Sequence, residues 1–199
     1  DQKDWKGPAG EAIKSELASS VPGLPQAEPS LKITYVQPKD FTGLLRYVRN
    51  ILVVTIDPTA YTKVSVGYEN NVWARGQVVV SLKAPNTESI VEYSKTHEKA
   101  LVNFFVKVEM NRAIEQLQKE YSMVVMDNPK SDLNVMLNAP ANFTYYKDTT
   151  DFFWSSNNAN TGRMDLIVYT FPYTEPNTFT EEYLVAKRDS VLKANLPGS

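Results

Sequence analysis

The amino-acid sequence predicts an α+β fold: a mixed sheet with a parallel βαβ start and an antiparallel C-terminal meander, packed with helices in a two- or three-layer sandwich. Two observations support this prediction. A continuous apolar run over residues 50–56 is typical of a strand buried on both faces, as in parallel sheets. After Tyr121 the hydrophobic period changes to two, which indicates strands separated by turns. At 199 residues, we expect a single domain over 1–199.

In the first half of the chain, helix and strand patterns alternate. Pro8 suits a first helical turn, and Ile13 and Leu17 have the i,i+4 spacing of one helix face. A strand, a short helix and a second strand form a βαβ pattern, which predicts a parallel pair. Residues 59–75 fit either a strand or a packed loop. We expect helices over residues 8–20 and 40–48, and strands over 31–35, 50–56 and 77–82.

The second half begins with a helical pattern from Asn86 to Tyr121, which is too long for one helix in a domain of this size. We therefore expect a break near residues 94–98. Residues 157–162 are rich in Asn and Gly and predict a hairpin loop. The capping-box sequence 178–181 predicts a final helix that ends before Leu196. The strands of the meander are expected over 133–137, 143–145, 152–154 and 166–171.

Composition excludes several classes of function. The chain has no cysteine, which removes disulfides, thiolate nucleophiles and iron–sulfur clusters, and one histidine, which removes sites that need two imidazoles. A net charge of −2 with no basic run makes a nucleic-acid interface unexpected. Apolar runs of four or five residues are far too short to span a membrane. We expect no metal and no cofactor.

Catalytic candidates are few. The lone His97 needs an orienting carboxylate and a target to act as a general base, and we expect it to be solvated or to cap a helix. Asp57 follows the buried strand, where open α/β sheets bind ligands, yet Asp-Pro is also an ordinary turn initiator. Glycoside hydrolysis needs two carboxyl groups about 5–9.5 Å apart. Asp151 and Glu109 lie beside aromatic runs, yet a chain with 23 acidic residues contains accidental pairs. No catalytic residue is assigned.

Aromatic side chains crowd the segment 143–173. Adjacent strand residues face opposite sides of a sheet, so one member of the pair Tyr145/Tyr146 must reach the surface or lie under a covering helix. Exposed rings there, with Trp154, would stack on sugars or anchor a protein partner. The alternative is that helices cover both faces and all these rings are core. Trp73 and Arg75 precede a strand, where Arg75 would meet an anion or pair with a carboxylate.

The chain contains the motifs Asp4–Pro8, Val21–Gln26, Arg49–Leu52, Val72–Arg75, Val102–Phe105, Glu109–Arg112, Asp151–Ser155, and Tyr173 with Thr178–Ser190. In this order, over nearly the whole chain, they resemble an uncharacterised family (a domain of unknown function) of lipoproteins from gut-type Gram-negative bacteria. The resemblance implies a periplasm-facing or surface protein whose signal peptide and lipid-attached cysteine precede Asp1, so that this chain is a fragment of a longer anchored protein. The family has no established catalytic residue.

These observations predict a non-enzymatic, lipid-anchored envelope protein that binds a protein partner or a cell-wall glycan, with a membrane contact only through the anchor. The candidate binding residues are Asp57, Trp73, Arg75, Tyr145, Tyr146 and Trp154. The competing hypothesis is a carboxylate-based, glycan-processing envelope enzyme, which needs two carboxyl groups facing one cleft and a raised pKa on one of them. The oligomeric state stays open.

Overall fold

The computed structural model describes residues 2–24 and 26–196, and the chain falls into two compact units. Unit 1 covers residues 1–111 and unit 2 covers residues 112–199. Sequence patterning predicts one domain, whereas contacts within the chain group it in two. Among the described residues, no helix is long and apolar enough to cross a membrane.

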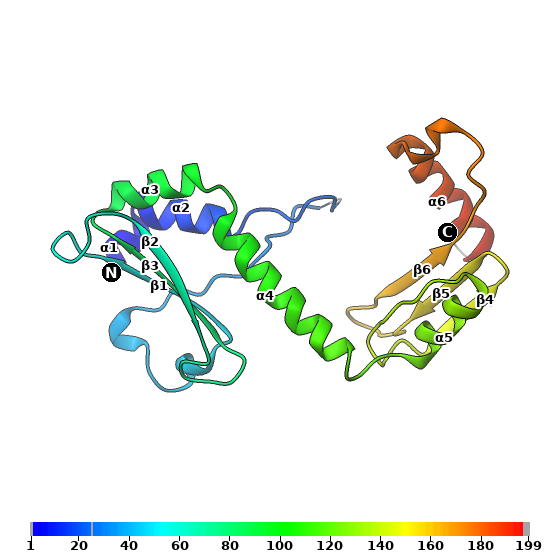
Figure 1. Cartoon of the computed structure of the whole chain (residues 1–199), viewed down its shortest axis with the longest axis horizontal. Coiled ribbons are helices and arrows are strands. Elements are labelled where there is room, and N and C mark those ends of the chain that lie inside the picture. Colours follow the sequence, from blue (N-terminus) through cyan, green and yellow to red (C-terminus); the bar gives the residue numbers. More distant parts are fainter. Residues whose placement is uncertain (1, 25, 197–199) are drawn as a thin grey trace. The chain divides into compact units, whose positions relative to one another are not determined.

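Unit 1 combines short helices with one three-stranded sheet (Figure 1). In the sheet β3 is central, with β1 parallel to it on one side and β2 antiparallel on the other. The elements are α1 (Gln2–Lys6), α2 (Pro8–Leu17), the 3₁₀ turns η1 (Pro38–Asp40) and η2 (Gly43–Tyr47), β1 (Asn50–Ile56), β2 (Ser65–Asn70), β3 (Val78–Ala84), α3 (Thr87–Thr96) and α4 (Ala100–Leu117), whose end belongs to unit 2.

The core of unit 1 lies between one face of this sheet and the helices. Alternate residues of β3 point to that face, from Val78 to Ala84, and pack against Ile13 of α2, Ile90 of α3 and Phe105 of α4. Leu82 is completely buried, which corresponds to a stabilisation of about 2–3 kcal/mol. Figure 1 shows α2 and α3 running side by side over the sheet.

The parallel start is confirmed, but its strands and connection differ from the expected βαβ unit. No strand forms over 31–35; Leu31 packs on the core and the Tyr35 ring stacks on Trp5, so the alternation comes from packing without a ladder. The chain instead runs from β1 through β2, which returns antiparallel, into β3. The helix expected over 40–48 is replaced by the two 3₁₀ turns.

Most other predictions for the first half hold. The strand over 50–56 is confirmed with the same bounds, and that over 77–82 is confirmed as β3. The expectation that the strand 50–56 is buried on both faces is wrong, because β1 is an edge strand and none of its residues is fully buried. Within the segment 59–75, which fits either a strand or a packed loop by sequence, the structure forms the strand β2. The long helical pattern breaks between α3 and α4, where Lys99 has a φ of 61°.

Unit 2 is built on an antiparallel three-stranded meander in the order β4-β5-β6, as expected (Figure 1). The α+β class is therefore confirmed, with the parallel pair and the meander in two separate sheets. After the end of α4, the elements are α5 (Met123–Asp132), β4 (Tyr145–Thr149), β5 (Phe152–Ser156), β6 (Asp165–Tyr169), η3 (Pro176–Phe179) and α6 (Glu181–Asn195).

The core of unit 2 is small. It gathers Phe153 of β5, Val125 of α5, and Ala139 and Phe143 from the segment between α5 and β4. Leu133 and Leu137 pack against this core from the same segment without entering the sheet. The cluster therefore joins α5 and the segment that follows it to one face of the meander.

Two predictions for this half are wrong in detail. The strand expected over 133–137 does not form, and the preceding helix α5 was missed; it contains Pro129, a residue that normally breaks helices. The final helix starts later than the capping box suggests, because Thr180 caps it by accepting a bond from Tyr183 N, while Thr178 is buried in η3. Its predicted end before Leu196 is confirmed.

Candidate functional site

The two aromatic pairs of the meander are arranged differently. Tyr145 and Tyr146 of β4 are both exposed, at 56% and 53%, whereas Phe152 and Phe153 of β5 are both buried. β5 is the central strand and is covered on both faces, while β4 is an edge strand. The alternative in which every ring of the segment 143–173 is core is therefore wrong.

Trp154 lies on the same face of the meander as Tyr145, diagonally across the β4–β5 pair. Its indole Nε1 donates a 3.0 Å hydrogen bond to Asp165 Oδ1, and the guanidinium of Arg163 stands 6.0 Å from the ring centroid. Arg163 also bonds Asp165, at 3.1 Å to Oδ2. The Trp154 ring is thus held in one orientation by two polar neighbours.

The electrostatics of Asp165 follow from these contacts. Burial alone would raise the pKa of this carboxyl, but hydrogen bonds from Arg163, Ser156 and Trp154 and the positive charge of Arg163 outweigh it and lower the pKa. The carboxylate is therefore charged at neutral pH and accepts the hydrogen bond of the Trp154 indole N–H.

Trp73 and Arg75 lie in the β2–β3 loop of unit 1. The Trp73 ring packs edge-on against Phe41 with centroids 5.4 Å apart, and its backbone N–H donates to Gln77 Oε1 at 3.0 Å. Gln77 is buried and donates to the carbonyls of two residues that precede β1. The Trp73 side chain thus packs within its own loop region, against Phe41, while Arg75 is exposed.

Asp57 lies at the other end of that sheet, directly after β1. Its carboxylate accepts bonds from the Thr59 hydroxyl at 2.6 Å and the Thr59 N–H at 2.8 Å, and these bonds lower its pKa. This is the geometry of a turn initiator. Asp57 is separated by the length of the sheet from Trp73 and Arg75, so the candidates of unit 1 do not form one site.

His97 is the C-cap residue of α3. Its ring stacks on Tyr93 at 4.2 Å, and Nδ1 lies 2.9 Å from the Thr96 hydroxyl. These partners all belong to α3 and none is a carboxylate. The expectation that His97 caps a helix is confirmed.

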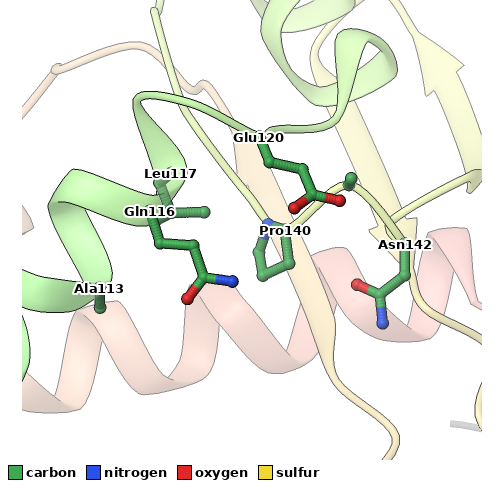
Figure 2. Close-up of a pocket in the computed structure, with 7 residues that line it drawn as sticks. Ala113, Gln116, Leu117, Glu120, Pro140 and Asn142 are labelled. Atoms are coloured by element: carbon green, nitrogen blue, oxygen red, sulfur yellow. The ribbon is translucent and has the colours of Figure 1, made fainter.

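A depression in unit 2 brings together polar residues that sequence patterning did not connect. It has a volume of about 360 Å³ and is formed by the last turns of α4 and the loop before β4. Figure 2 shows Gln116 and Leu117 on the helix side, Pro140 and Asn142 on the loop side, and the Glu120 carboxylate directed toward the loop. Its remaining lining residues are Ala113 and Ala141.

Ser122 holds the two sides of this depression together. Its backbone N–H donates to Ala139 O at 2.9 Å, and its hydroxyl donates to Phe143 O at 2.5 Å, so it spans the loop that carries Asn142. The same hydroxyl accepts the N–H of Val125 and caps α5. Ser122 is buried, and both its N–H and its hydroxyl have hydrogen-bond partners. The loop is therefore fixed relative to Glu120, two residues before Ser122.

The sequence contains a pattern for each side of this depression, but none that connects the two sides. Gln116 and Glu120 have the i,i+4 spacing of one helix face, and Asn142 belongs to an Asn-x-Thr triplet. Nothing local joins residue 120 to residue 142, because that link depends on α5 and on the bonds of Ser122. The missed helix therefore also concealed the depression.

The structure gives little support to a catalytic or metal centre. Glu120 is the one carboxylate that lines the depression. In the part of the chain that is described, no three His, Asp or Glu side chains are grouped as metal ligands. The pKa values of Asp57 and Asp165 are both lowered, whereas a glycosidase acid needs a raised one.

Comparisons with known proteins agree with a two-part organisation. Residues 1–118 match the model of a domain of unknown function (DUF8532), and residues 122–199 match a second domain of unknown function (DUF4837). No curated protein and no solved structure matches the chain. The matches confirm an uncharacterised family; lipid attachment and bacterial origin stay predictions.

Proposed function

The chain belongs to the DUF8532 family, whose function is unknown, and from its geometry we propose a non-enzymatic protein that binds a glycan through unit 2. The observation that carries the proposal is the depression of unit 2, which is lined by a carboxylate, two side-chain amides and the apolar side chains of alanine, leucine and proline residues. Sugars present hydroxyl groups that both donate and accept hydrogen bonds. Glu120 accepts such bonds, and Gln116 and Asn142 both donate and accept them.

Two exposed aromatic residues, Tyr145 and Tyr146, follow the depression closely in the sequence. Asn142 is three residues from Tyr145, so their Cα atoms are at most about 10 Å apart. A glycan of two or three units that occupies the depression would reach the Tyr145 or Tyr146 ring and stack on it. Rings stacked on sugars and amides bonded to hydroxyls are complementary interactions, because a sugar has an apolar face and a polar edge.

The competing hypothesis of a glycan-processing enzyme has less support. Retaining and inverting glycosidases use two carboxyl groups about 5–9.5 Å apart across the scissile bond. The depression offers one, Glu120, beside amides that cannot donate a proton. The same lining that suits recognition of hydroxyl groups therefore lacks an acid–base pair.

The cellular setting is part of the proposal. The family resemblance of the motifs above implies a lipid anchor and a place in the cell envelope, where cell-wall glycan is the abundant carbohydrate. We therefore propose an envelope protein that contacts this glycan while tethered to a membrane.

The test is a binding titration with a defined probe. Chitotetraose, a chain of four N-acetylglucosamine units, is titrated into the protein by calorimetry, with maltotetraose as a second sugar. We expect Asn142→Ala and Gln116→Ala each to weaken binding about tenfold, the value of one or two lost hydrogen bonds. Tyr145→Ala and Tyr146→Ala report on stacking in the same way.

Matched variants separate recognition from folding. Gln118→Ala removes an exposed amide directly after α4 but outside the depression, and Tyr173→Ala removes an exposed ring outside the meander. Both are expected to bind like the unmodified chain. Loss of binding in these controls, or no binding of either sugar by the unmodified chain, would contradict glycan recognition. Release of shorter sugars from the probe would instead favour the enzyme.

A further inference from the structure

The edge strand β2 of unit 1 is open along its whole length. All six of its residues are exposed, and β3 is its one neighbour in the sheet. An edge of this kind offers backbone N–H and C=O groups to another strand unless proline, charge or a covering segment prevents it. β2 contains no proline and one charged residue, Glu69.

The hydrogen bonds show which residues of β2 face the open edge. Asn71 donates its N–H to Gln77 O at 2.9 Å, so Asn71 points toward β3. In an antiparallel pair the backbone groups of successive residues alternate between the two sides. The N–H and C=O groups of Val66, Tyr68 and Asn70 therefore point away from β3 and into solvent.

We propose that two copies of this chain associate through β2, in antiparallel pairing about a two-fold axis at Val66. This register is one of those in which outward-facing residues oppose each other, with Val66 opposite Val66 and Tyr68 opposite Val64. It also places Lys63, two residues before β2, opposite Glu69 of the second copy. By symmetry that charge pair forms twice.

Charge selects this register over its neighbours. A two-fold axis at Gly67 places Lys63 opposite Asn71, and one at Tyr68 places it opposite Trp73, so neither forms an ion pair. An axis at Glu69 would oppose two carboxylates. Opposite charges directly across an antiparallel pair stabilise it, and like charges destabilise it. β1, the other edge, has no charged residue to favour a register.

The side chains next to the edge suit a dimer as well. A hollow of about 130 Å³ lies beside β2, lined by Val66 and Tyr68 and, from α3 and α4, by Tyr93, Leu101 and Phe104. Val66 and Tyr68 are 41% and 60% exposed although they point to the helix-covered face. In the proposed pair, Val64 and Val66 of the second copy extend this face and cover the rim of the hollow.

The test measures self-association of the full chain by sedimentation equilibrium over a range of concentrations. Lys63→Glu and Glu69→Lys each convert two attractive pairs into two repulsive ones, and we expect each to weaken the dimer about tenfold or more. An equimolar mixture of the two variants restores attraction, because in the mixed dimer both positions 63 and 69 of one copy carry a carboxylate and both positions of the other carry an ammonium group. The mixture is therefore expected to associate like the unmodified chain.

A matched pair of variants controls for net charge. Lys39→Glu and Glu28→Lys make the same charge changes at exposed sites away from β2, and they should leave the dimer unchanged, alone or mixed. Amide hydrogen exchange adds a readout of the backbone: the N–H groups of Val66 and Tyr68 should become protected as the concentration rises. A chain that stays monomeric, or a dimer indifferent to both β2 variants, overturns the proposal and leaves the edge to a different partner.

Discussion

Units 1 and 2 have sheets of the same size but stabilise them differently. Each has a buried central strand, β3 or β5, beside an exposed edge strand. β3 buries aliphatic side chains under helices, in a cluster of ten buried residues. β5 buries two phenylalanines next to Ser155 and Ser156, and its cluster has four buried residues.

The buried hydroxyls of unit 2 account for the difference. Ser155 donates to Tyr145 O at 2.9 Å, and Ser156 donates to Met164 O at 3.1 Å, so the central strand is bonded to both sides by side chains as well as by its ladders. Where little apolar area is buried, such bonds define the position of each segment. Unit 2 can therefore leave Tyr145 and Tyr146 exposed without losing its register.

The largest expected effect concerns the core of unit 2. Phe153→Ala removes a completely buried ring from a cluster of four buried side chains and should destabilise unit 2 by about 3–5 kcal/mol. Hydrogen exchange resolved by peptide should show loss of protection over 122–196. Equal loss of protection over 50–111 would show that the two units do not unfold separately.

The corresponding change in unit 1 is Leu82→Ala, at a side chain that is also completely buried. We expect a loss of about 3 kcal/mol, since the larger surrounding cluster can relax around the cavity. Urea unfolding followed by circular dichroism measures it. A loss larger than that of Phe153→Ala would reverse the comparison between the two cores.

A smaller effect is expected at Ser122. Ser122→Ala removes the cap of α5 and leaves Phe143 O without its donor, at a cost of about 1–3 kcal/mol. Ser190→Ala, on the exposed side of α6, serves as the control and should change the free energy of unfolding by less than about 0.5 kcal/mol. If the two variants are equally stable, the hydrogen bonds of the Ser122 hydroxyl do not contribute to the stability of unit 2.

The smallest effect concerns Asp165 on the surface of the meander. Its folded pKa is lowered, so its stabilising contribution is present above the unfolded value of about 3.9 and is lost as the pH falls through the folded value. Asp165→Asn should therefore lower the urea midpoint slightly at pH 7, and this difference should shrink as the pH falls through the folded pKa. The Trp154 indole N–H resonance should shift in the variant at pH 7 and, in the unmodified chain, at acid pH.

Sequence patterns correctly predicted the elements that are specified by residues within the element itself. The strand 50–56 is continuously apolar, and the helical pattern that starts at Asn86 gives α3, which Asn86 caps by accepting a bond from Ser89 N. The strand expected over 31–35 failed because alternation alone does not provide a neighbouring strand. α5 was missed because the alternating pattern after Tyr121 predicted strands there, whereas residues 123–132 form a helix that accommodates the completely buried Pro129.

The candidate site was less predictable than the fold. The period of a strand predicted that one member of the pair Tyr145/Tyr146 would reach the surface or lie under a helix. In the structure both are exposed, because β4 is an edge strand. The depression joins Glu120 to Asn142 through the hydrogen bonds of Ser122, across a separation of 21 residues between Ser122 and Phe143. Contacts between distant segments of this kind leave no periodic signal in the sequence.

The shared hydroxyl of Ser122 also implies an order of folding. A ten-residue helix with an internal proline is not stable alone, so α5 needs its cap and its contacts with β5 to persist. The cap is held in place by Phe143, which reaches Ser122 only once the intervening loop has closed. We therefore expect α5 to form late, after the β5–β6 hairpin, and substitutions in α5 to change the unfolding rate more than the folding rate.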